Sequence, residues 1–109
     1  MVKNALPVII IDEKKGIYEQ SNDKAVYAIS KISKRFNLIK YLQTKDNCQI
    51  AELAGLKHQT DKDTMKAIKL INKLFRQNTG VPFDLISHND TSGYSLNKTE
   101  LDIQRPPSV

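Results

Sequence analysis

The chain has 109 residues, of which 39 % are hydrophobic and 27 % are charged, and this size and balance predict one folded domain with a modest core. Seventeen Lys and Arg residues against 12 Asp and Glu give a net charge of +5, which favours a polyanionic partner such as nucleic acid or an anionic membrane. The single cysteine, Cys48, excludes an intrachain disulfide and fits a reducing compartment.

The first 29 residues predict a small antiparallel sheet. Residues 8–11 are β-branched and end at a charged turn in which Gly16 supplies a positive φ. Residues 17–19 give the second predicted strand. Residues 25–29 follow a polar turn and give the third.

A helical period then replaces the strand pattern. Ser33 is a suitable N-cap for a helix that ends at residues 45–47. Asn47 is expected to cap a second, short helix, with Gly55 at its C-cap. The apolar side chains that share one face of the first helix are Phe36, Leu38, Ile39 and Leu42.

The strongest helix pattern comes next and precedes a hairpin. Thr60 and Asp63 resemble a capping box, which predicts a helix over residues 61–77 that stops before Pro82. Residues 83–87 and 93–96 predict two strands joined by a polar tip, and residues 98–109 predict a flexible tail. The order of elements indicates an α+β fold, a winged helix-turn-helix: three helices, a small N-terminal antiparallel sheet and a C-terminal β-hairpin wing, in a domain of residues 1–97.

The long helix separates apolar from basic side chains. Its predicted apolar sector holds Ala67, Ile68, Leu70, Ile71, Leu74 and Phe75. A helix fits the major groove of DNA, where cations neutralise phosphates and amides or arginines read base edges. The alternative is an ordinary solvated face, but acidic partners one turn away are missing after Asp63. The predicted DNA-binding residues on the opposite side are Lys62, Lys66, Lys69, Asn72, Lys73 and Arg76.

Met65 is the one apolar residue on the basic side of this helix. Two interpretations remain open from the sequence. Its side chain contacts a thymine methyl group, or it fills a gap beside the preceding turn.

Nothing in the sequence predicts an enzyme, a cofactor or a metal site. His58 and His88 are too far apart to indicate a metal site and are expected to be loop residues. Cys48 stands beside a helix start, where its pKa could fall, but no partner histidine motif accompanies it. No glycine-rich phosphate loop, nucleophile elbow or small-molecule site is evident. The apolar run at 8–11 is too short for a signal sequence or a membrane span, so a cytoplasmic protein without membrane contact is expected.

Two segments resemble the effector domain of OmpR/PhoB-type response regulators, a bacterial DNA-binding family. Residues 68–75, IKLINKLF, follow the apolar register of the family's recognition helix, I-S-R-L-R-K-K-L, and residues 93–96, GYSL, are similar to the G-Y-R-L that ends its hairpin. Residues 32–36 match the family's L-T-x-x-E-F stretch loosely. The resemblance implies a recognition helix in the major groove, a wing at the minor groove, and dimeric or tandem binding. It also implies DNA contacts by Lys69, Asn72 and Lys73.

The chain departs from that family at Leu70, where an arginine is common, and in a wing without arginine. It also has no receiver domain, so phosphorylation control is not implied. The primary hypothesis is sequence-specific binding of double-stranded DNA in transcriptional regulation. The alternatives are a winged-helix protein-interaction module and a replication or partition factor of a mobile element.

Overall fold

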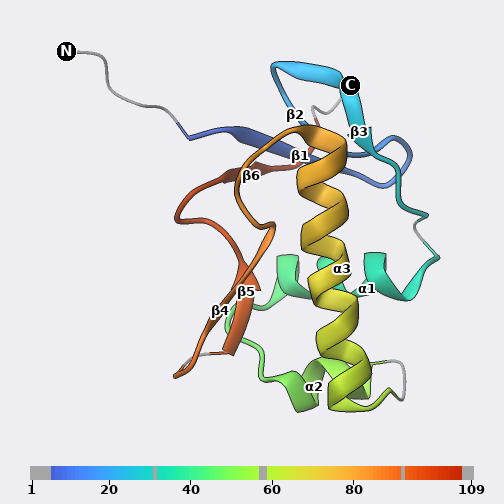
Figure 1. Ribbon diagram of the computed structural model, residues 1–109, viewed down its shortest axis with the longest axis vertical. Coiled ribbons are helices and arrows are strands. Elements are labelled where there is room, and N and C mark those ends of the chain that lie inside the picture. The colour runs from blue at the N-terminus through green and yellow to red at the C-terminus, as the bar shows by residue number, and fades with distance from the viewer. Residues whose placement is uncertain (1–5, 31, 57–58, 92, 107–109) are drawn as a thin grey trace.

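The computed structural model describes residues 6–30, 32–56, 59–91 and 93–106 as an α+β fold (Figure 1). The described residues form three helices and two small sheets. The strands before the helices are β1 (Val8–Asp12), β2 (Gly16–Glu19) and β3 (Asn22–Tyr27). The predicted strands are present, with β3 beginning three residues earlier than residue 25.

The first sheet has the strand order β3-β2-β1-β6. β1, β2 and β3 are antiparallel neighbours, as predicted, but β6 (Asp102–Gln104) pairs parallel to β1 and makes the sheet mixed. Leu101, next to β6, is only 1 % exposed and belongs to the core. The prediction of a flexible tail over residues 98–109 is therefore wrong for residues 101–104, because the strand pairing and the buried leucine fix them. Residues 107–109 lie outside the described part.

The helices begin and end largely where local signals place them. α1 (Lys34–Thr44) starts at Ser33, whose hydroxyl accepts a hydrogen bond from the Phe36 amide. α3 (Asp61–Thr79) starts at Thr60, whose hydroxyl accepts from the Asp63 amide, and ends at Gly80 in the left-handed conformation. Both caps satisfy amide groups that a helix N-terminus leaves unpaired.

The short helix α2 (Ile50–Gly55) differs from its prediction at both ends. Gln49, not Asn47, precedes it, and Gln49 makes no side-chain cap. Asn47 instead adopts a positive φ of 60°, which redirects the chain after α1. Gly55 is the last helical residue and not a left-handed cap.

α3 runs along the length of the molecule, with the first sheet at one end and α2 at the other (Figure 1). It packs against β2 and β3 of the sheet and against α1 and α2. Phe36, Ile39, Ile71 and Phe75 are fully buried at this junction. One hydrophobic core therefore holds the sheet and the helices together.

The second sheet is a hairpin of β4 (Ile86–Asn89) and β5 (Gly93–Leu96) after α3. β4 begins three residues later than the predicted residue 83. The α1–α2 link pairs with the hairpin, because Cys48 and Tyr94 exchange two backbone hydrogen bonds of 2.8 and 2.7 Å. Gly93, at a φ of +93°, lets the chains approach, since a Cβ there would lie 2.5 Å from the Cys48 carbonyl oxygen.

Within the described ranges, no helix is both long enough and apolar enough to cross a membrane.

Candidate nucleic-acid interface

The buried face of α3 is rotated relative to the apolar sector predicted from sequence. Leu70, predicted to be inside, is 42 % exposed, whereas Asn72, predicted to be outside, is 9 % exposed. The helix contacts the first sheet, α2 and the hairpin, so these neighbours and not hydropathy alone decide which side chains are buried. The residues of α3 that are buried are Thr64, Ile68, Ile71, Asn72, Phe75 and Thr79.

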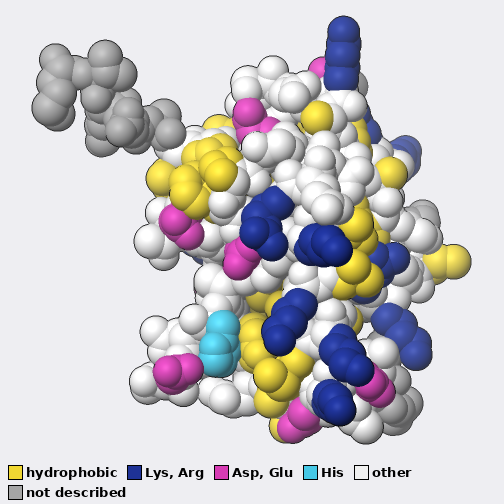
Figure 2. All heavy atoms as spheres, viewed as in Figure 1, with side chains coloured by type: hydrophobic (Ala, Val, Ile, Leu, Met, Phe, Trp, Pro, Cys, Tyr) yellow, Lys and Arg dark blue, Asp and Glu magenta, His cyan; other side chains and the backbone are white. Residues whose placement is uncertain are grey.

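Five cations line the opposite side of α3. They follow one another at spacings of four, three, four and three residues, so they form one stripe along the helix. All five side chains belong to exposed residues, and Figure 2 shows Lys and Arg gathered over α3 on this face. We call this set the basic stripe; its members are Lys62, Lys66, Lys69, Lys73 and Arg76.

The lysines of the basic stripe differ from other lysines of the described ranges in their lack of acidic partners. Among the described residues, none of these four lysines forms an ion pair. Lysines elsewhere do find carboxylates: Lys40 lies 2.7 Å from Glu13, and Lys98 lies 3.2 Å from Asp46. Positive charge is thus concentrated on α3, a distribution that the net charge of the chain does not reveal.

Arg76, the last cation of the stripe, has partners of its own. Its Nε lies 3.2 Å from a carboxylate oxygen of Asp84 and donates to the Asn72 carbonyl oxygen at 3.3 Å. Asp84 was not identified from the sequence, because its ion pair with Arg76 is a tertiary contact made across the end of α3. This end of the stripe is therefore less positive than the part formed by the four lysines.

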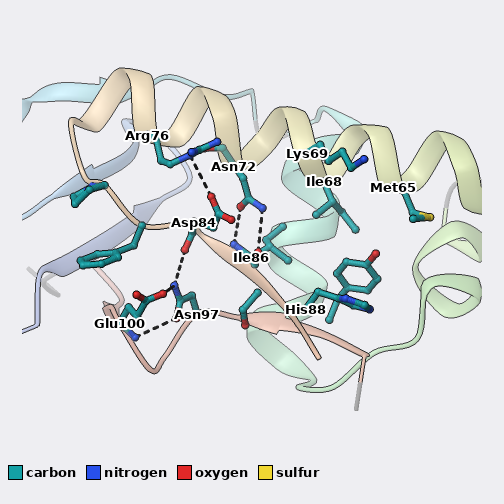
Figure 3. Close-up of a pocket in the computed structure, with 14 residues that line it drawn as sticks. Met65, Ile68, Lys69, Asn72, Arg76, Asp84, Ile86, His88, Asn97 and Glu100 are labelled. Atoms are coloured by element: carbon teal, nitrogen blue, oxygen red, sulfur yellow. Dashed lines mark hydrogen bonds and ion pairs between the residues drawn. The ribbon is translucent and has the colours of Figure 1, made fainter. Parts of the chain in front are cut away.

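Asn72 does not lie with the cations as predicted. Its Nδ2 donates to the Ile86 carbonyl oxygen at 3.0 Å, and its Oδ1 accepts from the Ile86 amide at 2.8 Å (Figure 3). Both atoms that would read an adenine are engaged with the backbone at the start of β4. The prediction that Asn72 lies on the exposed side of α3, among the DNA-binding residues, is wrong, because its side chain is buried and its amide joins α3 to the hairpin.

A groove of about 630 Å³ lies between α3 and the hairpin. Met65 and Lys69 border it from α3, and His88 borders it from β4 (Figure 3). Its floor includes the buried side chains of Ile68 and Tyr94. The groove thus places apolar surface directly beside the basic stripe.

His88 stacks on Tyr94 with ring centroids 4.4 Å apart, and its Nδ1 lies 3.8 Å from Asp90. These contacts orient the imidazole along the hairpin. The other histidine, His58, lies outside the described residues. In the described ranges, no three His, Cys, Asp or Glu side chains gather into a metal site.

A polar cluster joins α1 to α2. Glu52 accepts hydrogen bonds from Lys45, at 2.5 Å, and from the Tyr41 hydroxyl. These bonds, first from Lys45 and then from Tyr41, hold the pKa of Glu52 below its usual value. Burial raises the pKa of the nearby Cys48 thiol, which opposes the lowered pKa considered from its place beside a helix start.

The chain was compared with protein-family models, curated proteins and solved structures, and no family model, no curated protein and no solved structure matches it.

Proposed function

We propose that this chain is a winged helix-turn-helix protein that binds duplex DNA, with the exposed face of α3 in the major groove and the β4–β5 hairpin as the wing beside it. The observation that carries the proposal is the basic stripe, whose four lysines have no ion-pair partner in the described parts of the chain. Unpaired cations in a row on one helix are suited to a regularly spaced polyanion.

The dimensions of α3 suit this partner. From Lys62 to Arg76 the stripe extends about 21 Å along the helix axis, at 1.5 Å per residue. A B-DNA major groove about 12 Å wide admits one α-helix with its side chains. Lysines at the margins of such a helix reach the phosphates on either side, and those at its centre reach base edges.

The contacts around α3 support the proposal that it is held rigidly for the recognition of DNA. α2 packs across it, the Asn72 amide ties it to Ile86, and the Cys48–Tyr94 bridge holds the hairpin to the α1–α2 link. A rigid frame lowers the entropy lost when DNA is bound. We assign phosphate contacts to Lys62, Lys66 and Lys73 and a base contact to Lys69. The biological role that fits such a site is transcriptional regulation.

Charge reversal tests the proposal. The variant Lys66→Glu/Lys73→Glu removes two cations from the stripe and adds two anions. The matched control, Lys14→Glu/Lys24→Glu, changes the net charge equally, in the β1–β2 turn and on β3, at exposed lysines that form no ion pair with another described residue. Binding to a mixed-sequence duplex at low salt is measured by fluorescence anisotropy.

The proposal predicts loss of binding in the α3 variant and near-wild-type binding in the control, with both folded by circular dichroism. Equal weakening in both variants would mean that only the net charge attracts DNA. No binding by the folded wild type would refute the proposal and turn attention to a protein partner.

A further inference from the structure

An exposed apolar side chain interrupts the cations of α3. Met65 is 41 % exposed, three residues after Lys62 and four before Lys69. Residues at these spacings are neighbours on a helix surface, so Met65 is flanked by both lysines. A methionine buried as core filler would lose most of its exposure, so the exposed fraction disfavours the gap-filling interpretation.

The protein surface next to Met65 is also apolar. Met65 and Ile68 project from α3 toward the hairpin, on the side where His88 lies (Figure 3). Ile68 and Tyr94 line the same groove, and both are buried. The result is a small apolar notch, formed by Met65, Ile68 and Tyr94, at the edge of a basic surface.

Two polar side chains of α3 that line the same groove already have partners within the fold. Both amide atoms of Asn72 bind the Ile86 backbone, and the Nε of Arg76 is held by Asp84 and by the Asn72 carbonyl. Arg76 also lies 11 residues from Met65, about 16 Å along the helix axis, so Lys69 is the groove-lining cation of α3 that accompanies Met65. Next to Met65, the groups of α3 that can face a base are therefore an apolar side chain and the ammonium group of Lys69.

Among the groups that unmodified DNA presents in its major groove, the apolar one is the C5-methyl of thymine. We infer that Met65 is a specificity-determining residue that contacts the 5-methyl group of a pyrimidine, with Ile68 and Tyr94 behind it. The inference rests on the proposed function and adds a base preference to it. A 5-methylcytosine presents the same methyl at the same position, so the recognised chemistry is the methyl and not the whole thymine.

The experiment begins with a duplex selected from a random library by the wild-type protein at a salt concentration that suppresses non-specific binding. Each thymine of the selected duplex is then replaced singly by deoxyuridine, which removes only the methyl group. Dissociation constants are measured for the wild type, Met65→Ala and Met65→Leu. Leu70→Ala is the matched control, because Leu70 is the other apolar side chain of α3 with similar exposure.

Burial of one methyl group is worth about a fourfold change in affinity. The wild type and Met65→Leu should lose about fourfold at one or two thymine positions, and Leu70→Ala should show the same loss there. Met65→Ala should bind the thymine and uracil forms equally. At such a position, exchange of the T·A pair for C·G should weaken wild-type binding, and 5-methylcytosine should restore about fourfold.

The inference is overturned if a duplex is selected and bound, yet Met65→Ala shows the same thymine-to-uracil ratios as the wild type. Restoration by thymine alone, and not by 5-methylcytosine, would overturn the methyl-group assignment. If no duplex is bound at all, the proposed function itself fails and the inference falls with it. These results are distinguishable, because the first two require measurable DNA binding and the last is its absence.

Discussion

The side-chain amide of Asn72 on α3 makes two hydrogen bonds with the backbone of Ile86 on β4, one as donor at 3.0 Å and one as acceptor at 2.8 Å. These two hydrogen bonds resemble those that the backbone groups of neighbouring strands exchange. It extends the hairpin's backbone pairing onto a helix, and it fixes the distance between the basic stripe and the hairpin. Asn72, which helix periodicity alone places on the exposed side of α3, thus connects the helix to the hairpin inside the protein.

We expect Asn72→Ala to destabilise the fold by about 2–3 kcal/mol, because it leaves the buried amide and carbonyl of Ile86 without partners. Urea denaturation measures the change, and Gln77→Ala, on the exposed side of α3, should stay within about 0.5 kcal/mol of the wild type. Replacement of a residue that only contacted a DNA base would instead weaken DNA binding and leave stability unchanged. Unchanged stability with weaker DNA binding would contradict the structural role of Asn72.

Two glycines should respond to alanine in opposite directions. Gly93→Ala should destabilise by roughly 2 kcal/mol or more, since its φ is +93° and the new Cβ would meet the Cys48 carbonyl oxygen at 2.5 Å. Gly55→Ala should be neutral or stabilising by up to about 1 kcal/mol, because Gly55 is helical and nothing lies within 4 Å of an added Cβ. Thermal unfolding of both variants checks the signs, and equal effects would argue against the Cys48–Gly93 approach.

The finding that residues 101–104 belong to the folded part of the chain can be tested at Leu101. Replacement of this buried leucine by alanine should cost about 2–5 kcal/mol, the range for truncation of a packed leucine. Thr99→Ala, at an exposed position nearby, is the control and should have little effect. If Leu101→Ala unfolds at the same denaturant concentration as the control, the Leu101 side chain does not contribute to the core as the structure indicates.

The cluster around Glu52 predicts an acid-dependent stability. Because its folded-state pKa is lowered, the unfolded chain binds protons first, so the stabilisation is present above the ordinary glutamate pKa of about 4.3 and is lost as pH falls through the folded value. Tyr41→Phe removes one of the two donors and should reduce this loss in part, and Glu52→Gln should remove it. Melting temperatures measured across the acid range test whether the loss of stability in acid decreases from the wild type to Tyr41→Phe and then to Glu52→Gln. A wild-type slope retained in Glu52→Gln would assign the acid sensitivity to another group.

Local signals predicted most of the helices and strands. The caps at Ser33 and Thr60 lie where their side chains can bond to the amide three residues later, a relation set within one turn of chain. The short strands of the first sheet and the hairpin likewise follow from β-branched runs between turns. The strand β6 was missed because three residues with one apolar side chain carry no local signal, and their pairing with β1 is a long-range event.

The candidate site was predicted in part, for a similar reason. Periodicity placed Lys62, Lys66, Lys69 and Lys73 together, and the structure leaves them exposed on one side of α3. It could not place Asn72, because the amide is buried by its bonds to a strand 14 residues later. Two further features are tertiary properties: the lack of carboxylate partners for these lysines within the described residues, and the pairing of Arg76 with Asp84.

The most direct test of the account is the salt dependence of duplex binding by the wild type and by single lysine-to-alanine variants. If Lys62, Lys66 and Lys73 neutralise phosphates, the logarithm of the binding constant should fall with the logarithm of salt at a slope of about −2.7, at −0.9 per contact. Lys66→Ala and Lys73→Ala should each reduce the slope by about 0.9. Lys24→Ala, on β3, should leave it unchanged. A slope that is near zero, or that responds equally to all three substitutions, would contradict the assignment of α3 as the DNA-binding helix.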